Sequence, residues 1–303
     1  VIKGSQSGEI STLNSCITPA GAVLDANLLT VEGLVTLLGD LHPVQAAMAQ
    51  GHGAQCGFCT PGFIMSLVAG QLASEAAPSR EDVIASIGGN LCRCTGYRPI
   101  VAAALNAGVD QNTDTTRDAL CTALNKPATT DPANTYHRPQ SVAELKTVLS
   151  TIGGTIAAGT TDLWLRYTQG YEDFEHLIDI AGLSEWRGIK VSDGCLEIGA
   201  ATTHADLLSW FSQTEWQHWY GALVEMLHRF GSPQIRARGT LGGNIANGSP
   251  VADWPPILLA LDAELELLGR QGERWLPIRE FFKGYRQTAL AEQELISRIR
   301  FPL

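Results

Sequence analysis

Four cysteines in two close pairs constrain this chain more than any other feature of its sequence. Cys56 and Cys59 stand in GAQCGFCTPG, and Cys92 and Cys94 stand in GGNLCRCTGYRP. The pattern is therefore C-x2-C, a spacer of 32 residues, and C-x-C. Four thiolates that converge from two loops suit an iron–sulfur cluster or a tetrahedral metal ion.

The spacing leaves three interpretations of these thiols open. Each iron of a [2Fe-2S] cluster takes two thiolates, and two close pairs supply them directly. A structural zinc site usually takes C-x2-C twice, so the C-x-C half is less typical of zinc. Four free thiols without a shared role are the third interpretation. Seven cysteines in 303 residues do not resemble a disulfide scaffold, which favours a reducing, cytoplasmic setting.

Bulk composition argues against two classes of partner. The formal net charge is −10, and no basic stripe that would hold the phosphates of a nucleic acid is present. No apolar run approaches the roughly 20 residues that a helix needs to span a bilayer. A length of 303 residues predicts two or three domains. Because the chain starts at Val1 with strand-like residues, we expect it to be a fragment that lacks its front.

Local patterns divide the chain into four parts. Residues 1–36 are predicted to be strands and turns, and residues 37–108 a helical bundle with both cysteine pairs on loops that enter helices. Its four helices are expected at LHPVQAAMAQG, TPGFIMSLVAGQLA, PSREDVIASIGG and RPIVAAALNAG. Residues 109–134 are rich in Thr, Asp, Asn and Pro and are predicted to be a linker. Residues 135–303 mix strands and helices.

The cysteine motifs also carry a resemblance. HGAQCGFCTPGFIMS and GNLCRCTGYRPI closely resemble the helical [2Fe-2S] domain of the xanthine dehydrogenase and aldehyde oxidase family of molybdenum hydroxylases. The resemblance implies that Cys56, Cys59, Cys92 and Cys94 are the four metal ligands. In the family this cluster lies beside the molybdopterin and takes the first electron from molybdenum.

A second resemblance lies upstream. STLNSC resembles the stretch of the family's ferredoxin-like domain that carries the fourth ligand of another [2Fe-2S] cluster, so Cys16 matches that ligand. The first three ligands have no counterpart in this sequence. A small buried residue is the alternative interpretation of Cys16.

Two small-residue loops stand out in the second half of the chain. They are AAGTTDL (157–163) and TLGGNIANGSP (240–250). Such loops turn backbone N–H groups toward an anion, and two of them can hold one pyrophosphate from both sides. Neither is the G-x-G-x-x-G of a dinucleotide-binding unit, so a pair of tight turns is the alternative. Arg236 and Arg238, which precede the second loop, are expected to be solvated charges.

RGTLGGNIANGSPVAD and AAGTTDL resemble the flavin-domain signature of the same family, in which many members carry a second glycine where Thr160 stands. The resemblance implies that residues of both loops bind the diphosphate of FAD. These are Ile156, Gly159, Thr160 and Thr161 on one side, and Thr240, Gly243, Asn244, Asn247 and Asp253 on the other. Phe230 matches an aromatic residue placed against the isoalloxazine, with a core position at a helix end as the alternative.

The resemblance covers nearly the whole chain in the family's order of domains. It implies an α+β multidomain fold: the C-terminal remnant of a ferredoxin-like β-grasp domain, a four-helix [2Fe-2S] bundle and the first part of an α/β FAD-binding domain. The implied function is that of the small, iron–sulfur and FAD subunit of a bacterial xanthine dehydrogenase. A large partner subunit would hold molybdopterin and oxidise hypoxanthine or xanthine, in a heterotetramer of two small and two large subunits.

In that scheme electrons pass through two [2Fe-2S] clusters and FAD to NAD+, and this chain itself supplies no catalytic acid or base. Two alternatives stay open. The partner subunit of a related oxidoreductase acts on aldehydes or N-heterocycles, because the substrate is selected outside this chain. The other alternative belongs to a different class, a zinc-stabilised interaction module without a redox role.

Overall fold

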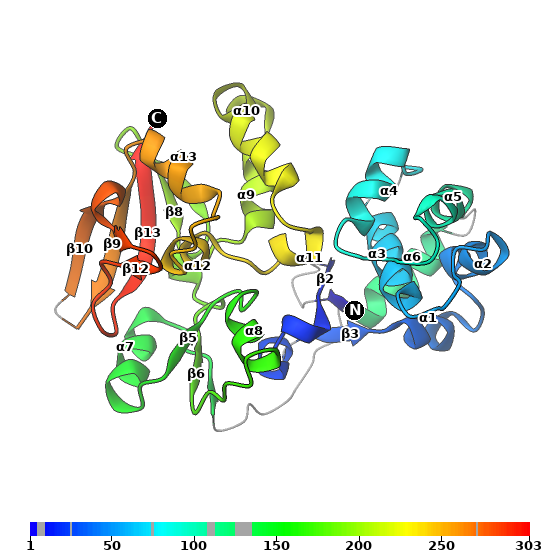
Figure 1. Cartoon of the computed structure of the whole chain (residues 1–303), viewed down its shortest axis with the longest axis horizontal. Coiled ribbons are helices and arrows are strands. Elements are labelled where there is room, and N and C mark those ends of the chain that lie inside the picture. Colours follow the sequence, from blue (N-terminus) through cyan, green and yellow to red (C-terminus); the bar gives the residue numbers. More distant parts are fainter. Residues whose placement is uncertain (5–9, 25, 74–75, 108–112, 125–134, 271) are drawn as a thin grey trace. The chain divides into compact units, whose positions relative to one another are not determined.

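A computed structural model describes all residues except 5–9, 25, 74–75, 108–112, 125–134 and 271 (Figure 1). The chain divides into two compact units. The first unit consists of residues 1–131 together with 232–235, and the second of residues 132–231 together with 236–303. Every helix in the described part of the chain is too short or too polar to cross a lipid bilayer.

The first unit begins with a small antiparallel sheet. Strand β1 (Ile2–Gly4) lies between β2 (Ile10–Thr12) and β3 (Asn27–Leu29). Helix α1 (Val31–Leu38) follows directly, so the prediction of strand and turn up to residue 36 is wrong from residue 31 onward. The reason is packing, because Leu34 of this helix is completely buried in the core of the unit.

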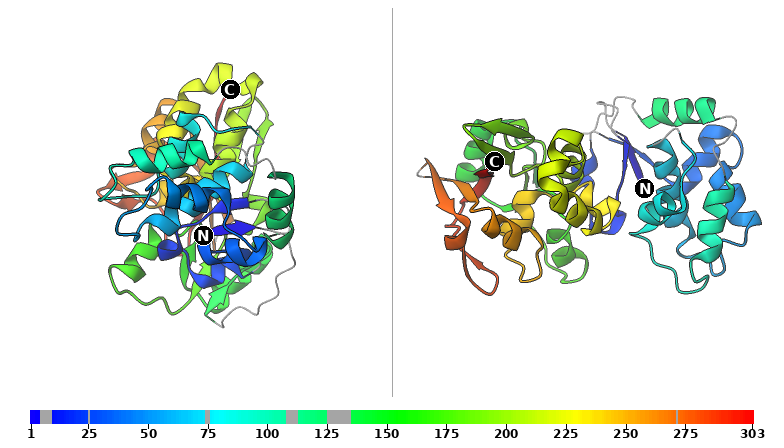
Figure 2. Two further views of the ribbon diagram at one scale, coloured as in Figure 1. Left: turned by 90° about the vertical axis from the view of Figure 1, so that its right-hand side faces the viewer. Right: turned by 90° about the horizontal axis from the view of Figure 1, so that it is seen from above.

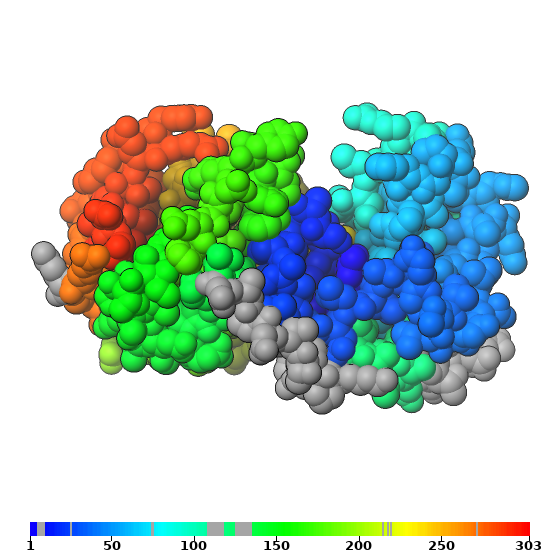
Figure 3. Space-filling model, turned by 90° about the horizontal axis from the view of Figure 1, so that it is seen from below, coloured from blue at the N-terminus to red at the C-terminus, as the bar shows by residue number. Residues whose placement is uncertain are grey.

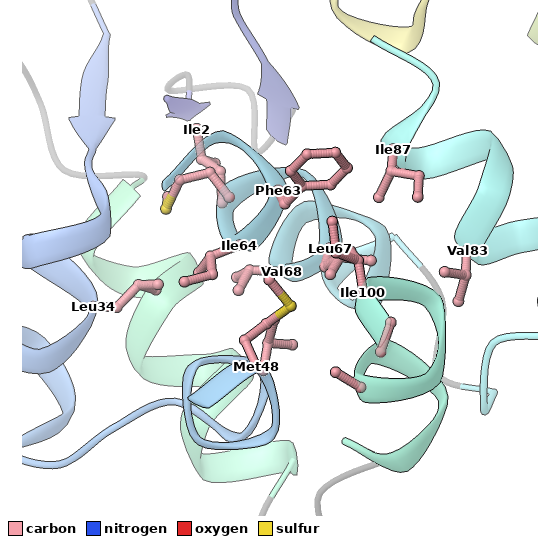
Figure 4. Packing of buried hydrophobic residues seen from close by; sticks show 14 of the residues in the cluster. Ile2, Leu34, Met48, Phe63, Ile64, Leu67, Val68, Val83, Ile87 and Ile100 are labelled. Carbon is pink, nitrogen blue, oxygen red and sulfur yellow. The ribbon is translucent and has the colours of Figure 1, made fainter. Parts of the chain in front are cut away.

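Four further helices follow where the sequence predicts them. They are α2 (Pro43–Gln50), α3 (Thr60–Leu72), α4 (Arg80–Ile87) and α5 (Arg98–Asn106). Helix α3 is the central element, and side chains of its neighbours meet around it (Figure 4). Phe63 and Val68 of α3, Met48 of α2 and Ile100 of α5 are among the buried residues of this core. The ends of the helices therefore carry both cysteine loops on one packed scaffold.

Residues 113–124, inside the predicted linker, form helix α6 (Thr113–Leu124). Leu120 and Leu124 are buried in the core of the first unit, and the side chain of Asn27 donates a hydrogen bond to the Leu124 carbonyl at 3.1 Å. The polar composition suggested a linker, whereas the i, i+4 spacing of the two leucines is the helical signal that composition hides. The remainder of the predicted linker, residues 109–112 and 125–134, lies outside the described residues.

The second unit is built on two larger sheets. Within the described residues, the antiparallel sheet has the order β10-β9-β13-β8-β7, and the parallel sheet has the order β4-β6-β5. The strands of the antiparallel sheet are β7 (Ile189–Ser192), β8 (Cys195–Gly199), β9 (Glu264–Gly269), β10 (Gly272–Pro277) and β13 (Leu295–Pro302). Those of the parallel sheet are β4 (Tyr136–His137), β5 (Thr155–Ala157) and β6 (Leu177–Asp179). A short hairpin pairs β11 (Phe282–Gly284) with β12 (Gln287–Thr288).

Helices cover the sheets of the second unit. They are α7 (Val142–Thr151), α8 (Leu163–Thr168), α9 (His204–Phe211), α10 (Thr214–Arg229), α12 (Leu241–Ala246) and α13 (Trp254–Ala260), and α11 (Pro233–Arg236) joins α10 to α12. Helices α9 and α10 lie side by side (Figures 1 and 2). Residues around α7 and the parallel sheet form a continuous surface, green in Figure 3. The larger core lies between the antiparallel sheet and helices α9, α10, α12 and α13, and Trp254 is completely buried in it.

Candidate cluster and flavin sites

The structure brings the four cysteines of the two motifs together. The sulfur atoms of Cys56 and Cys94 lie 3.4 Å apart. The thiols of Cys59 and Cys92 lie close enough to shift each other's pKa in opposite directions. Each contact joins one member of the C-x2-C pair to one member of the C-x-C pair. The thiols are therefore paired across the two motifs, an arrangement that spacing along the chain does not reveal.

Hydrogen bonds and burial give these thiols different acidities. The Thr95 hydroxyl, followed by the backbone N–H groups of Thr95 and Cys94, lowers the pKa of Cys92 to about 7. The N–H of Phe58 lowers the pKa of Cys56, whereas burial raises the pKa of Cys59 to about 11. The thiolate is the form of cysteine that binds metal, so Cys92 is the thiol best prepared for ligation.

A closed ring of hydrogen bonds shapes the loop that carries Cys92. The Cys92 N–H donates to the hydroxyl of Tyr97 at 3.0 Å, the Tyr97 N–H donates to the Thr95 hydroxyl at 3.2 Å, and the Thr95 N–H donates to the Cys92 sulfur at 3.4 Å. Gly96 and Tyr97 both have positive φ, +66° and +67°. The Tyr97 ring packs edge-on against Phe63 of α3, with centroids 6.2 Å apart.

The donor set fits a two-iron cluster better than its spacing alone indicated. In the described part of the chain the four thiols meet in two pairs, and each iron of a [2Fe-2S] cluster takes two thiolates. Gly57, at φ +80°, gives the loop between Cys56 and Cys59 a conformation that other residues adopt only at a cost. Within the described residues, no three His, Cys, Asp or Glu side chains are placed as the ligands of a single metal ion.

Cys16 belongs to neither cysteine motif. It is an exposed thiol in the short 3-10 helix Ser15–Ile17 of the first unit. The interpretation of Cys16 as a small buried residue is therefore wrong. Its role as a ligand of a second cluster stays a prediction, because residues 5–9 of the same small domain lie outside the described part.

The two small-residue loops of the second unit lie against each other. A Cβ atom at Gly159 would stand 2.1 Å from the carbonyl oxygen of Arg238 and 2.8 Å from the Cα of Gly239, so only glycine fits. Thr240, the next residue, caps α12 and forms an isolated β-bridge with Thr203. The fold therefore brings the two loops into contact, which their sequence alone did not establish.

Arg238 is the residue that joins the loops. Its Nε donates to the Gly159 carbonyl at 3.1 Å, and its terminal nitrogen lies 3.4 Å from the Thr160 hydroxyl. Burial lowers the pKa of Arg238, and the nearby charge of Asp179 opposes that shift. Arg236 in turn donates to the Phe230 carbonyl at 2.8 Å. The expectation that both arginines are solvated charges is therefore wrong, because each is bound to backbone carbonyl oxygens.

The stretch TLGGN was expected to be an open loop, but it is the capped start of α12. Its backbone N–H groups already have partners. Those of Leu241, Gly242 and Asn244 donate to the carbonyl oxygens of Thr202, Ala200 and Thr240, and that of Gly243 donates to the Thr240 hydroxyl. Gly242 is required by packing, since a Cβ there would lie 2.6 Å from that of Ala200. These four N–H groups are therefore not available to bind a phosphate, and the prediction is wrong for them.

Polar groups for a ligand remain elsewhere in the two loops. The N–H groups of Gly159 and Thr161 have no hydrogen-bond partner among the described residues. The Oδ1 atom of Asn244 is buried and also lacks a partner in the described part of the chain. Thr160 is buried with φ +62°, a conformation that glycine adopts at lower cost. These groups fit a ligand that presents both donors and acceptors, as FAD does.

The other predicted flavin residues surround this region. Ile156 belongs to β5 and packs against the smaller core, Asn247 caps the end of α12, and Asp253 is exposed at the start of α13. Phe230 is half-buried, and its ring lies 4.2 Å from that of His204. The Trp254 indole donates to Nδ1 of His204 at 3.2 Å. The sequence did not single out His204, because nothing in its local motif distinguishes it, and Arg238 was expected only as a solvated charge.

Comparison with known proteins adds two matching family models. The model of the [2Fe-2S] binding domain matches residues 30–105, and the model of the FAD binding domain in molybdopterin dehydrogenase matches residues 128–303. The chain belongs to the molybdopterin dehydrogenase family. As a member of this family of molybdenum hydroxylases it carries both the iron–sulfur and the FAD domain, as the motifs predicted.

Curated relatives of this family member include several xanthine dehydrogenases. Xanthine dehydrogenase 1 of Arabidopsis thaliana is 28% identical over 361 residues, which cover 96% of this chain and 26% of the relative. The xanthine dehydrogenase of Drosophila subobscura is 30% identical over 347 residues, which cover 95% of this chain and 26% of the relative. The chain therefore spans about a quarter of the length of the curated relatives it matches.

Two solved structures resemble the chain over slightly more than half its length. Carbon monoxide dehydrogenase from Hydrogenophaga pseudoflava is 36% identical with a TM-score of 0.52, covering 57% of this chain and 60% of that chain. Quinoline 2-oxidoreductase from Pseudomonas putida 86 is 27% identical with a TM-score of 0.51, over the same shares of 57% and 60%.

Proposed function

We propose that this chain is the electron-transfer part of a molybdenum hydroxylase. The observation that carries the proposal is the convergence of four thiols from two motifs in a chain that also has the family's FAD domain. When bound, the clusters and FAD relay electrons from a molybdopterin on a partner subunit to NAD+. The residues of this chain act by holding and orienting these groups, and we assign none of them as a catalytic acid or base.

Cys56, Cys59, Cys92 and Cys94 are the proposed ligands of the helical-domain cluster. The contacts across the motifs favour one iron for Cys56 and Cys94 and the other for Cys59 and Cys92. Cys16 is the proposed ligand of a second cluster, in the ferredoxin-like domain. That assignment rests on the resemblance of its sequence context and on its exposed thiol.

The flavin site is proposed where the two loops of the second unit meet. The N–H groups of Gly159 and Thr161 would donate to the diphosphate, and the Asn244 side chain would supply a further polar contact. Phe230, at the end of α10, would lie against the isoalloxazine. Ile156, Thr160, Thr240, Gly243, Asn247 and Asp253 complete the proposed lining.

A partner subunit is expected to cover the cysteine loops. Phe58 lies between the first two cysteines and is 95% exposed, and Leu91 precedes the second pair and is 76% exposed. Two uncovered apolar side chains beside the thiols support the docking of another protein there. We propose the molybdopterin-binding large subunit as that protein, in a cytoplasmic heterotetramer of two small and two large subunits.

Hypoxanthine and xanthine are the proposed substrates of the complex, because the curated relatives that match 95–96% of the chain are named xanthine dehydrogenases. The second candidate is an aldehyde or an N-heterocycle. The structural likeness to quinoline 2-oxidoreductase favours this second candidate, since quinoline is an N-heterocycle. The choice lies in the partner subunit, so substrate profiling of the whole complex decides between the two.

The test is a metal and flavin analysis of the chain purified with its partner. The proposal predicts acid-labile sulfide, FAD and a visible absorption band that xanthine bleaches. It predicts two irons per FAD for the helical-domain cluster, and about four where the ferredoxin-like cluster is also built. Cys92→Ser should lower the iron content and slow flavin reduction while FAD stays bound. Cys121→Ser is the control, because that half-buried thiol of α6 lies outside both motifs. Zinc without sulfide would refute the redox function and favour an interaction module.

A further inference from the structure

We propose that Thr95 sets the reduction potential of the helical-domain cluster by donating its hydroxyl to the sulfur of Cys92. The inference rests on the proposed function, since it requires that Cys92 be an iron ligand. The Oγ1 atom of Thr95 lies 3.1 Å from the Cys92 sulfur, and the Thr95 N–H donates to the same sulfur at 3.4 Å. One residue thus directs two hydrogen-bond donors to one thiol.

The direction of the hydroxyl bond follows from the chemistry of ligation. Between a thiol and a hydroxyl either atom can be the donor. A cysteine that binds iron is a thiolate without a proton, so Thr95 must then donate. The Tyr97 N–H donates to the same hydroxyl oxygen at 3.2 Å and occupies one of its lone pairs. This leaves the hydroxyl hydrogen free to point at sulfur.

The surrounding loop holds Thr95 in this position. Tyr97 adopts φ +67°, which costs free energy for a bulky residue and persists only where its contacts impose it. Those contacts are the Cys92 N–H that binds the Tyr97 hydroxyl and the Phe63 ring that packs against it. The donors of Thr95 are therefore preorganised by a locked turn, and they do not depend on a flexible surface side chain.

The four thiols differ in the hydrogen bonds that they accept. In the described part of the chain, Cys92 is the thiol of this group for which a side-chain hydroxyl bond is found. Donors to a cluster sulfur favour the more negative, reduced state.

The step that Thr95 influences is a one-electron reduction. With the cluster bound, Cys92 would hold one of its irons, and one electron from the molybdopterin centre, or from dithionite in a titration, would reduce one ferric iron to ferrous iron. No covalent bond forms or breaks, and the hydroxyl keeps its proton while its hydrogen bond to sulfur strengthens.

The test is a redox titration of the full chain in complex with its partner, followed by electron paramagnetic resonance. Thr95→Val replaces the hydroxyl by a methyl group of similar size, and Thr95→Ser keeps the hydroxyl. Thr36→Val is the matched control, because the Thr36 hydroxyl binds the Glu32 carbonyl on an exposed face of α1. Thr95→Val should lower the equilibrium constant for reduction about tenfold, a downward shift of about 59 mV for one electron. Thr95→Ser and Thr36→Val should titrate like the parent protein.

Each outcome of this experiment decides something different. An unchanged potential in Thr95→Val with full iron content overturns the role of Thr95 and leaves the proposed function intact. A Thr95→Ser potential as low as that of Thr95→Val also overturns it. If Thr95→Val loses iron, Thr95→Ala removes the same hydroxyl without the branched side chain and is judged by the same criterion. The absence of any [2Fe-2S] signal in the parent complex refutes the proposed function and the inference together.

Discussion

Arg238 donates a hydrogen bond to the carbonyl oxygen of Gly159 at 3.1 Å, and this contact joins two loops that lie 79 residues apart in the sequence. The same guanidinium lies beside the buried Asp179, whose carboxylate accepts a hydrogen bond from Tyr136 at 2.7 Å. A buried cation is tolerated when such partners surround it. The proposed flavin site thus depends on a polar network that lies behind it.

Replacing Arg238 should weaken FAD binding. Arg238→Met removes the bond to Gly159 and leaves Asp179 without its cationic neighbour, and Arg238→Lys keeps the charge without the planar Nε donor. A lost bond of this kind is worth about 1.5–3 kcal/mol, which corresponds to roughly tenfold or more in affinity. Titration of the flavin-free protein with FAD, followed by flavin fluorescence, measures the change. Arg279→Met, at an exposed arginine, should bind like the parent protein. Equal affinities for all three variants would rule out this role of Arg238.

Asn244→Ala should separate ligand binding from folding. The Oδ1 atom of Asn244 is buried without a partner among the described residues, so its removal takes away an unsatisfied polar atom. We expect the flavin-free protein to keep its thermal midpoint within a few degrees, while FAD affinity falls about tenfold. Calorimetry of the flavin-free protein and FAD titration provide the two measurements. A large loss of stability with unchanged affinity would assign Asn244 to the fold alone.

Gly242→Ala should destabilise the second unit. Its added Cβ would lie 2.6 Å from the Ala200 Cβ and 2.9 Å from the Ala200 carbonyl oxygen. Overpacking of this kind costs about 1–3 kcal/mol of unfolding free energy. Urea denaturation followed by tryptophan fluorescence reports on this unit, because all seven tryptophans lie in it. Gly182→Ala, with open space around the new methyl group, is the control and should unfold at the parent urea concentration.

His204 should make the second unit sensitive to acid. Burial, followed by the charge of Arg236, lowers the pKa of His204 to about 3, whereas the unfolded value is about 6.5. Protonation therefore favours the unfolded state, so the stability that His204 contributes is complete above pH 6.5 and is lost as the pH falls toward 3. At pH 5 the loss amounts to about 2 kcal/mol, from about 1.5 pH units at 1.36 kcal/mol each.

The measurement for His204 is the urea midpoint of tryptophan fluorescence at pH 7.5 and at pH 5. Phe230 and Trp254 enclose the imidazole, and the Trp254 indole binds its Nδ1. His204→Gln should be less stable than the parent at pH 7.5, because the buried contacts are disturbed, but it should lose less stability on acidification. Parallel losses in the two proteins would show that other groups cause the acid sensitivity.

Local patterns in the sequence were sufficient to predict the helices that carry the cluster site. The proline or serine starts of α2–α5, and the glycines that end α2 and α4, are local signals, so the four predicted helices were found. The positions of both cysteine motifs at helix starts followed from the same signals. Helix α6 was missed, because its polar composition resembles a linker and its two buried leucines matter only when a core is present to receive them.

The sequence by itself determined the kind of chemistry: four thiols at recognisable spacings and two loops of small residues. Only the tertiary structure decided which groups meet. It pairs Cys56 with Cys94 across the motifs, buries Arg238 against Gly159, and engages the N–H groups of residues 241–244 with the protein itself. The physical reason is that a motif specifies the local backbone, whereas pairing, burial and hydrogen-bond satisfaction depend on segments that only folding brings together.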